Sequence, residues 1–309
     1  MQLLNVLSLT PHVNDWLASS RQPRVLHLFD HACNLINEDR EILSIVIPTI
    51  GNGPFNLVVE DEICFSEYLS LESEVSTSPA QLHLGDLTVH TANAKIWNPC
   101  PDWEKLRARK DDIRHQLTQL PTLAPDASAG VTNYMNSGGL DTPFAKTAQG
   151  YSTSARVQSL VSILSLALVN ADVSSALKLT SQLAGLGPGL TPAGDDYIMG
   201  AIYAAWIIHP FEIARMLAKE IADSAAPLTT SLSAAWLRSA GRGEAGILWH
   251  KFFDALGSVG WLGNPTHPKG VQEAMENILA VGETSGADAL AGFTSVFVSW
   301  MKKAGFSHE

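Results

Sequence analysis

The first third of the chain has the hydrophobic pattern of short strands. Up to Asn98, brief runs of apolar, often β-branched residues are separated by turn residues such as the Gly51-Asn52-Gly53-Pro54 cluster. Closely spaced strands with little helical pattern between them favour a small antiparallel barrel or sandwich. The expected strands are Val25–Phe29, Ile42–Ile47, Phe55–Val59, Gln81–Leu84 and Leu87–Thr91.

The second half changes to a helical period. Beyond Ala155, apolar residues recur every three or four positions nearly to the end of the chain. Asp172 is the expected N-cap of one of these helices. The expected helices are Arg156–Asn170, Val173–Leu183, Pro192–Ile208, Pro210–Ser224, Leu228–Ala240, Glu244–Leu256, Val271–Val281 and Ala287–Lys303.

The segment between these two patterns is expected to connect them. A helix is predicted for Asp102–Leu120, and Pro121 ends it. Residues 122–154 are rich in Gly, Ser, Thr, Ala and Pro, which is typical of a linker or a mobile lid. The predicted fold class is therefore α+β, with a β-rich domain (1–100), a connector (101–154) and an α-helical domain (155–309).

Charge and cysteine content narrow the class of partner and the location. The 309 residues carry 20 Lys plus Arg against 31 Asp plus Glu, and no dense basic cluster that could follow a nucleic-acid backbone is present in the sequence. Three cysteines lie outside any CxxC spacing, which favours a reducing compartment, and Cys33 is expected to be a small buried residue. The most apolar stretches are shorter than the roughly 20 residues that cross a bilayer. We therefore expect a cytoplasmic protein that binds neither nucleic acid nor a membrane.

The strongest local feature is a glycine-rich run that precedes a helical pattern. Four glycines and two prolines fall within residues 185–194. Thr191 suits the N-cap and Pro192 the first helical position, so the run is expected to end in oriented N–H groups that can bind a phosphate or carboxylate. Gly187, Gly189, Thr191 and Gly194 are accordingly candidate substrate-binding residues.

Asp195 and Asp196 complicate this interpretation. Two carboxylates in a first helical turn compete for the same positive dipole and repel an unscreened anion. Either they cap the helix, or a cation takes part. Magnesium binds carboxylate and phosphate oxygens together, so it is a possible cofactor, with Asp195, Asp196 and Asp288 as its candidate ligands.

A later segment repeats part of the glycine-rich one. Gly194, Asp196 and Gly200 have the same spacing as Gly286, Asp288 and Gly292. On helices, each Asp shares a face with the Gly four residues later, so a neighbouring backbone could approach beside each carboxylate and the two helix starts could face one site. Chance repetition and purely architectural helix packing are the alternatives. The two aspartates of the repeat, Asp196 and Asp288, are candidate catalytic residues together with the neighbouring Asp195. The second segment adds Thr284, Ser285 and Gly286 to the candidate substrate-binding residues.

Two segments between these repeats could also contact an oxyanion. Thr230 and Ser231 offer hydroxyl groups, and Arg242 offers a guanidinium. The hydroxyl pair is equally typical of a helix N-terminus, and Arg242 of a solvated turn.

Residues 185–196, together with Thr284-Ser285-Gly286-Ala287-Asp288, resemble the AllH-like family. Asn34-Leu35, Gly53-Pro54 and the segment from Ala94 to Pro99 also look like this family, so the likeness spans most of the chain. The resemblance implies a subunit of oxamate carbamoyltransferase that works with FdrA-type and AllG-type subunits in anaerobic allantoin breakdown. Such a complex interconverts oxalurate plus phosphate with oxamate plus carbamoyl phosphate.

This implied reaction and the residue patterns agree on one point. Carbamoyl phosphate, oxamate and oxalurate are small anions, and the amides of Gly187 to Gly194 are candidate donors to them and to an oxyanion. The sequence identifies no general base. It also lacks the Ser-Thr-Arg-Thr phosphate loop of ordinary carbamoyltransferases, so a conventional member of that fold is not expected.

Two other functions stay open at the level of sequence. The Gly-Asp-Asp run at a helix start also resembles the magnesium-binding run of ADP-ribosylglycohydrolases, which would make the protein a magnesium-dependent hydrolase. Alternatively, the chain is a non-catalytic assembly subunit in which the Asp residues cap helices and the loop binds a partner.

Overall fold

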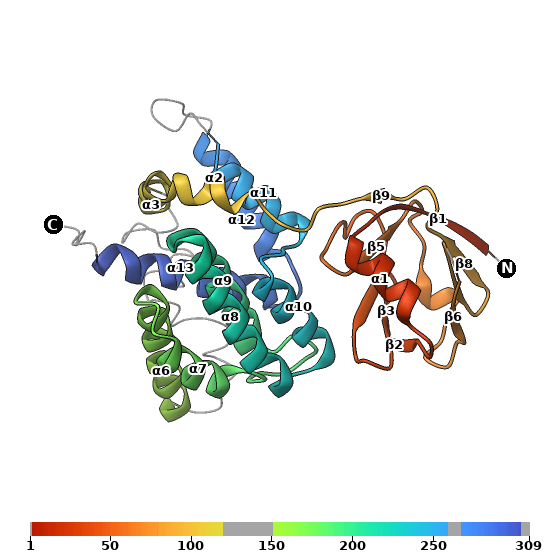
Figure 1. The fold of residues 1–309 in the computed structure, drawn as a ribbon, viewed down its shortest axis with the longest axis horizontal. Helices are drawn as coiled ribbons and strands as arrows, with labels where there is room; N and C mark the ends of the chain where they lie inside the picture. The colour runs from red at the N-terminus through yellow and green to blue at the C-terminus, as the bar shows by residue number, and fades with distance from the viewer. Residues whose placement is uncertain (1, 79, 120–150, 259–266, 304–309) are drawn as a thin grey trace. The chain divides into compact units, whose positions relative to one another are not determined.

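The structure is a computed structural model that describes residues 2–78, 80–119, 151–258 and 267–303. The chain forms two compact units (Figure 1): a β unit of Met1–Cys100 with Ala245–Ile247, and a helical unit of Pro101–Glu244 and Leu248–Glu309. The expected fold class, a barrel-like sheet followed by an all-helical region, is confirmed. Most of the expected linker or lid, residues 120–150, lies outside the described residues.

The β unit is built on one nearly closed sheet of nine strands within the described residues. The strand order is β2-β3-β4-β5-β1-β8-β7-β6, and β9 pairs with β1. The strands are β1 (Gln2–Leu9), β2 (Arg24–Leu28), β3 (Ala32–Ile36), β4 (Ile42–Val46), β5 (Asn56–Val59), β6 (Val75–Ser78), β7 (Gln81–Leu84), β8 (Leu87–His90) and β9 (Lys95–Ile96).

The sheet is mixed rather than purely antiparallel. β4 pairs with β5 in parallel, and β1 pairs in parallel with both β8 and β9. Every residue of β4 and β5 is buried, as is typical of parallel neighbours inside a sheet. The sequence pattern predicted no strand before Arg24, although β1 lies in the middle of the strand order.

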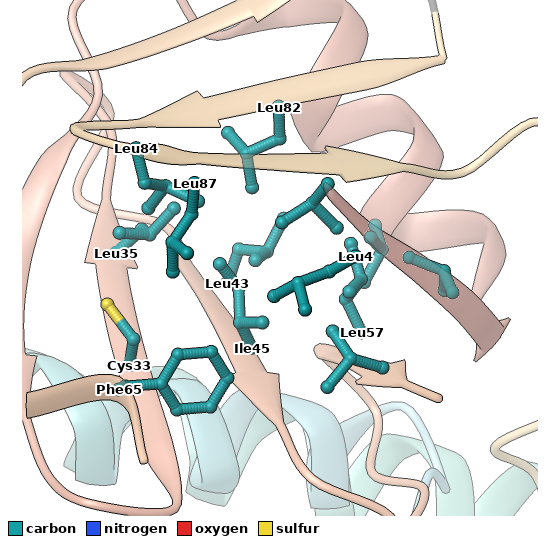
Figure 2. Packing of buried hydrophobic residues seen from close by; sticks show 14 of the residues in the cluster. Leu4, Cys33, Leu35, Leu43, Ile45, Leu57, Phe65, Leu82, Leu84 and Leu87 are labelled. Carbon is teal, nitrogen blue, oxygen red and sulfur yellow. The ribbon is translucent and has the colours of Figure 1, made fainter. Parts of the chain in front are cut away.

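The inward side chains of the sheet form a continuous apolar core. Figure 2 shows Leu4, Leu43, Ile45 and Leu57 gathered with leucines from β7 and β8. The helix α1 (Pro11–Ser19) contributes the fully buried Trp16, whose Nε1 donates to the Glu41 carbonyl at 3.1 Å. Cys33 lies in this core, as expected, and burial raises the pKa of its thiol to about 12.

The helical unit has its most buried element at its centre. Nearly every residue of α8 (Ala193–Ile208) is buried, as in a helix that is apolar on all sides, and α13 packs along it. Asp172 caps α7 by accepting from the Ser175 amide at 3.1 Å, as expected.

No helix in the described ranges is both long enough and apolar enough to cross a membrane. The remaining helices are α2 (Trp103–Ala108), α3 (Lys110–Gln119), α6 (Tyr151–Val169), α7 (Val173–Leu183), α9 (Phe211–Ala225), α10 (Ser231–Gly241), α11 (Ile247–Leu256), α12 (His267–Leu279) and α13 (Ser285–Lys303), with short 3-10 helices η1 (Phe65–Glu67) and η3 (Ala226–Leu228).

Candidate functional site

Helices α8 and α13 cross at two glycines. A Cβ atom on Gly200 would overlap the Ala289 carbonyl oxygen of α13, and one on Gly292 would overlap the Tyr197 carbonyl oxygen of α8. Each glycine therefore allows the other helix's backbone to approach, as its spacing from the preceding carboxylate predicted. The glycines therefore have an architectural role, because they allow the two helices to pack closely. The two helices also meet near their starts, as the repeat predicted.

The crossing is close to two-fold symmetric. Gly200 faces Ala289 and Phe293, whereas Gly292 faces Tyr197 and Ala201, and the two sets are offset by the same 92 residues. The same offset relates Asp196 to Asp288. The sequence repeat therefore corresponds to a structural repeat in which the two carboxyls occupy equivalent positions.

Gly194 and Gly286 occupy equivalent positions as well. Each lies in the first turn of its helix, and a Cβ there would overlap a carbonyl oxygen at the end of the preceding helix, Leu183 of α7 or Ile278 of α12. The Gly194 amide donates to the Leu186 carbonyl at 2.9 Å, and the Gly286 amide donates to the Val281 carbonyl at 3.1 Å. Both amides therefore donate within the chain, and substrate binding by Gly194 and Gly286 stays a prediction.

The loop before α8 exposes backbone amides. Gly187 and Gly189 are exposed and have φ values of +122° and +93°, a left-handed path that favours glycine. The amides of Gly187, Gly189, Leu190 and Thr191 donate no hydrogen bond to any part of the chain that the structure describes. These four groups, together with the first amide of α8 at Ala193, remain as donors for a ligand.

Asp195 holds this loop in shape. Its Oδ1 accepts from the Gly185 amide at 2.9 Å, and its Oδ2 accepts from Ser233 Oγ at 2.8 Å and from Thr229 Oγ1. Burial raises the pKa of Asp195, and these three hydrogen bonds partly offset the rise. Because both oxygens of Asp195 accept hydrogen bonds from two other segments of the chain, Asp195 positions the loop, and its catalytic role stays a prediction.

Thr230 fixes the other end of the loop. It is the N-cap of α10, accepting from the Ser233 amide at 3.1 Å, and its Oγ1 donates to the Leu190 carbonyl at 2.5 Å. Thr230 and Ser231 therefore lie at a helix start, which was the alternative to contact with an oxyanion: Thr230 caps α10 and Ser231 is its first residue. Arg242 is exposed and pairs with Glu244 at 2.7 Å, as in a solvated turn.

Asp196 is a buried carboxyl with an unsatisfied oxygen. Its side chain is 6% exposed, and Oδ2 has no hydrogen-bond partner among the described residues. Burial raises the pKa of Asp196 well above its usual range; a hydrogen bond from Ser285 opposes the rise, and the charges of Asp288 and Asp195 add to it. Asp196 therefore holds its proton to higher pH than an ordinary aspartate, and in its protonated form it does not repel an anion.

The second segment lies beside the first. Thr191 Oγ1 and Ser285 Oγ are 2.8 Å apart, and Asp288, 1% exposed, is close enough for its charge to act on Asp196. Thr191 was expected to cap α8, but Pro192 occupies the N-cap position and the Thr191 hydroxyl contacts α13 instead. Thr284 is half-buried, and its carbonyl accepts from the Asp288 amide at 2.9 Å. The structure thus brings together Thr191, Asp196, Ser285 and Asp288.

The geometry gives little support to a metal centre. Among the residues that the structure describes, no group of three or more His, Cys, Asp or Glu side chains is arranged to hold a metal ion. Asp195, one of the three expected ligands, is committed to Gly185, Thr229 and Ser233.

Sequence reasoning missed all three partners of Asp195. Ser233, Thr229 and the Gly185 amide bind its carboxylate, and none of them was a candidate site residue. Ser233 follows the cap residue Thr230 by three positions, so its side chain lies in the first turn of α10, where a serine can bind a neighbouring loop. Only that spacing could have pointed to it.

Two family models match the chain on either side of the connector. A model described as the AllH family N-terminal domain matches residues 5–96, and one described as oxamate carbamoyltransferase subunit AllH matches residues 183–297. The chain belongs to the AllH family. The second match begins at the end of α7 and ends within α13, so it contains both helix starts of the repeat. No solved structure matches the chain.

Proposed function

We propose that this AllH-family chain is a subunit of an oxamate carbamoyltransferase and supplies a binding site for the complex's small anionic substrates. The complex would contain FdrA-type and AllG-type partners and interconvert oxalurate plus phosphate with oxamate plus carbamoyl phosphate. The observation that carries the proposal is the exposed loop of unpaired amides beside the buried carboxyl of Asp196. The family match supports a multi-subunit carbamoyltransferase as the setting.

The loop suits the anionic part of each substrate. Its free amides at Gly187, Gly189, Leu190 and Thr191 precede the N-terminus of α8, where donors and helix dipole both favour negative charge. Asp195 and Thr230 hold the loop from opposite ends, so the donors are ordered before a ligand arrives. Preorganised donors of this kind bind phosphate or carboxylate and can stabilise an oxyanion.

Asp196 suits the proton transfer that the reaction requires. When phosphate attacks the carbamoyl carbon of oxalurate, a C–O bond forms and the C–N bond to oxamate breaks. The departing nitrogen must gain one proton, and hydrogen phosphate must lose one. A buried aspartic acid with a raised pKa can donate to that nitrogen and then recover its proton from phosphate. In the opposite direction, its carboxylate accepts the proton from oxamate.

The experiment that tests this function is reconstitution. The full chain, combined with its FdrA-type and AllG-type partners, is expected to form carbamoyl phosphate from oxalurate and phosphate, whereas omission of the chain abolishes turnover. Asp196→Asn is expected to lower turnover at least tenfold with normal assembly of the complex. Full activity without this chain, or unchanged activity with Asp196→Asn, contradicts the proposal.

A magnesium-dependent hydrolase is the alternative function, and ligand titration of the chain distinguishes it from anion binding by backbone amides. A chelator is expected to leave phosphate and oxamate binding by the chain unchanged, because the proposed donors are backbone amides. Binding that disappears with chelator and returns with Mg²⁺ favours the metal, and absence of binding by any of these ligands favours an assembly role.

A further inference from the structure

One carboxyl oxygen of Asp196 is buried and has no hydrogen-bond partner among the described residues. Oδ2 is inaccessible to solvent and has no partner, while Ser285 contacts the same side chain. A buried acceptor left unsatisfied lowers stability. A ligand that forms a hydrogen bond with this oxygen would offset the cost.

Asp288 provides a second acceptor in an equivalent place. It occupies the position on α13 that Asp196 occupies on α8, and the glycine contacts of the two helices obey the same two-fold relation. The charge of Asp288 acts on Asp196, so the two carboxyls are near neighbours. The site therefore presents two acidic side chains, related by an approximate two-fold axis, to one ligand.

The –NH2 group of a primary carboxamide has matching chemistry and symmetry. It is planar, carries two N–H donors and no charge, and its two donors are related by a two-fold axis along the C–N bond. A carboxyl group offers an acceptor oxygen whether or not it is protonated. A neutral donor pair also satisfies buried carboxyls without bringing another ion into the site.

We propose that Asp196 and Asp288 bind the –NH2 group of a carbamoyl ligand, each accepting one of its two N–H bonds. The inference rests on the proposed function, because carbamoyl phosphate is the reactant that carries this group next to a phosphate. Thr191 and Ser285, which are half-buried and 2.8 Å apart, connect the exposed loop amides to Asp196. A ligand with a carboxamide at one end and an anion at the other matches this sequence of groups.

The test compares carbamoyl phosphate with acetyl phosphate, which has a methyl group in place of –NH2. Calorimetric titration of the full chain is expected to show at least tenfold tighter binding of carbamoyl phosphate, because a methyl group donates no hydrogen bond to either carboxyl. Asp196→Leu replaces both carboxyl oxygens by methyl groups and is expected to reduce the preference below threefold while acetyl phosphate affinity is retained. Asp288→Leu is expected to behave in the same way.

Further variants of Asp196 and Asp288 and a control variant distinguish failure of the carboxamide inference from failure of the proposed function. Where a Leu variant does not fold, Asp196→Ala and Asp288→Ala, which also remove both carboxyl oxygens, replace it and are expected to lower the preference at least threefold. Asp254→Asn, on the exposed side of α11, controls for loss of a carboxylate. Equal affinity of the unmodified chain for the two acyl phosphates, or a full preference in either Asp variant, overturns the carboxamide inference alone. If neither acyl phosphate nor inorganic phosphate binds, anion binding by the proposed site is overturned as well.

Discussion

The hydroxyl oxygens of Thr191 and Ser285 lie 2.8 Å apart, although 94 residues separate them along the chain. Thr191 belongs to the glycine-rich loop and Ser285 begins α13, so this contact joins the two repeats at the points where their helices start. Ser285 also lies close enough to Asp196 to lower the pKa of that carboxyl. The loop, the start of α13 and the buried carboxyl are therefore one connected polar unit.

Alanine at the helix crossing is expected to destabilise the protein. In Gly200→Ala or Gly292→Ala, the new methyl group overlaps a backbone carbonyl that a side-chain rotation cannot move, so α8 and α13 must separate. We expect a loss of about 3 kcal/mol in the free energy of unfolding, at the upper end of overpacking effects. Urea unfolding followed by circular dichroism measures it.

Gly270→Ala provides the matched control for this prediction. Gly270 lies in α12, and nothing is within 4 Å of the position that its new methyl group would take. Alanine there is therefore expected to be neutral or to stabilise by about 0.5–1 kcal/mol. Equal effects of alanine at Gly200 and Gly270 contradict the close crossing.

The raised pKa of Asp196 predicts a pH-dependent effect on stability. Because its pKa is higher in the folded than in the unfolded chain, the folded state binds more protons between the two values. This carboxyl therefore stabilises the fold most at pH values below the pKa that it has in the unfolded chain. Its contribution to the free energy of unfolding declines as the pH rises from that value through the higher pKa that it has in the folded chain. Asp196→Asn removes the decline. The stability of the variant relative to the unmodified chain should thus increase by on the order of 1 kcal/mol or more from pH 5 to 8.

Denaturant unfolding at several pH values measures this change. Asp254→Asn, which removes an exposed carboxylate, controls for the altered net charge. A relative stability of Asp196→Asn that stays constant or decreases with pH would mean that Asp196 is charged at no cost in the folded protein, and the acid proposed for proton transfer would be lost.

Loss of Asp195 is expected to release the loop. Asp195→Ala leaves the Gly185 amide and the hydroxyls of Thr229 and Ser233 without their shared acceptor, at an expected cost of about 2–4 kcal/mol. Hydrogen exchange at the Gly185 and Leu186 amides, which donate to Asp195 and to the Leu183 carbonyl, should accelerate at least tenfold more than exchange in the β unit, which serves as the internal reference. Unchanged exchange in the loop contradicts the positioning role.

The sequence predicted the helices and the repeat well because both depend on local periodicity. The expected boundaries of α7 are those observed, and the spacing of Gly194, Asp196 and Gly200 correctly indicated close packing beside a carboxylate. The strand β1 was missed because its apolar run was not recognised as half-buried alternation, although Thr10 and Pro11 give a recognisable helix start directly after it.

The roles of individual polar side chains could not be predicted from local patterns. Asp195 and Asp196 are adjacent in sequence, but one accepts three hydrogen bonds and the other retains an unsatisfied oxygen. That difference depends on α10 and α13, which contribute Ser233 and Ser285 from distant positions in the chain. Thr191 likewise contacts α13 instead of capping α8 because tertiary packing overrides its local preference.

Titration of carbamoyl phosphate into the unmodified chain and two glycine variants shows whether the loop amides bind the anion. Gly187→Ala and Gly189→Ala impose similar backbone strain at positive φ, but only a Cβ at Gly187 meets the Ala193 amide, at 2.9 Å, whereas the one at Gly189 has nothing within 4 Å. If the loop amides hold the anion, the unmodified chain binds saturably and one-to-one, Gly187→Ala binds at least tenfold more weakly, and the affinity of Gly189→Ala changes less than threefold. Absence of saturable binding by the unmodified chain, or equal affinities of the two variants, would contradict binding of the anion by the loop amides.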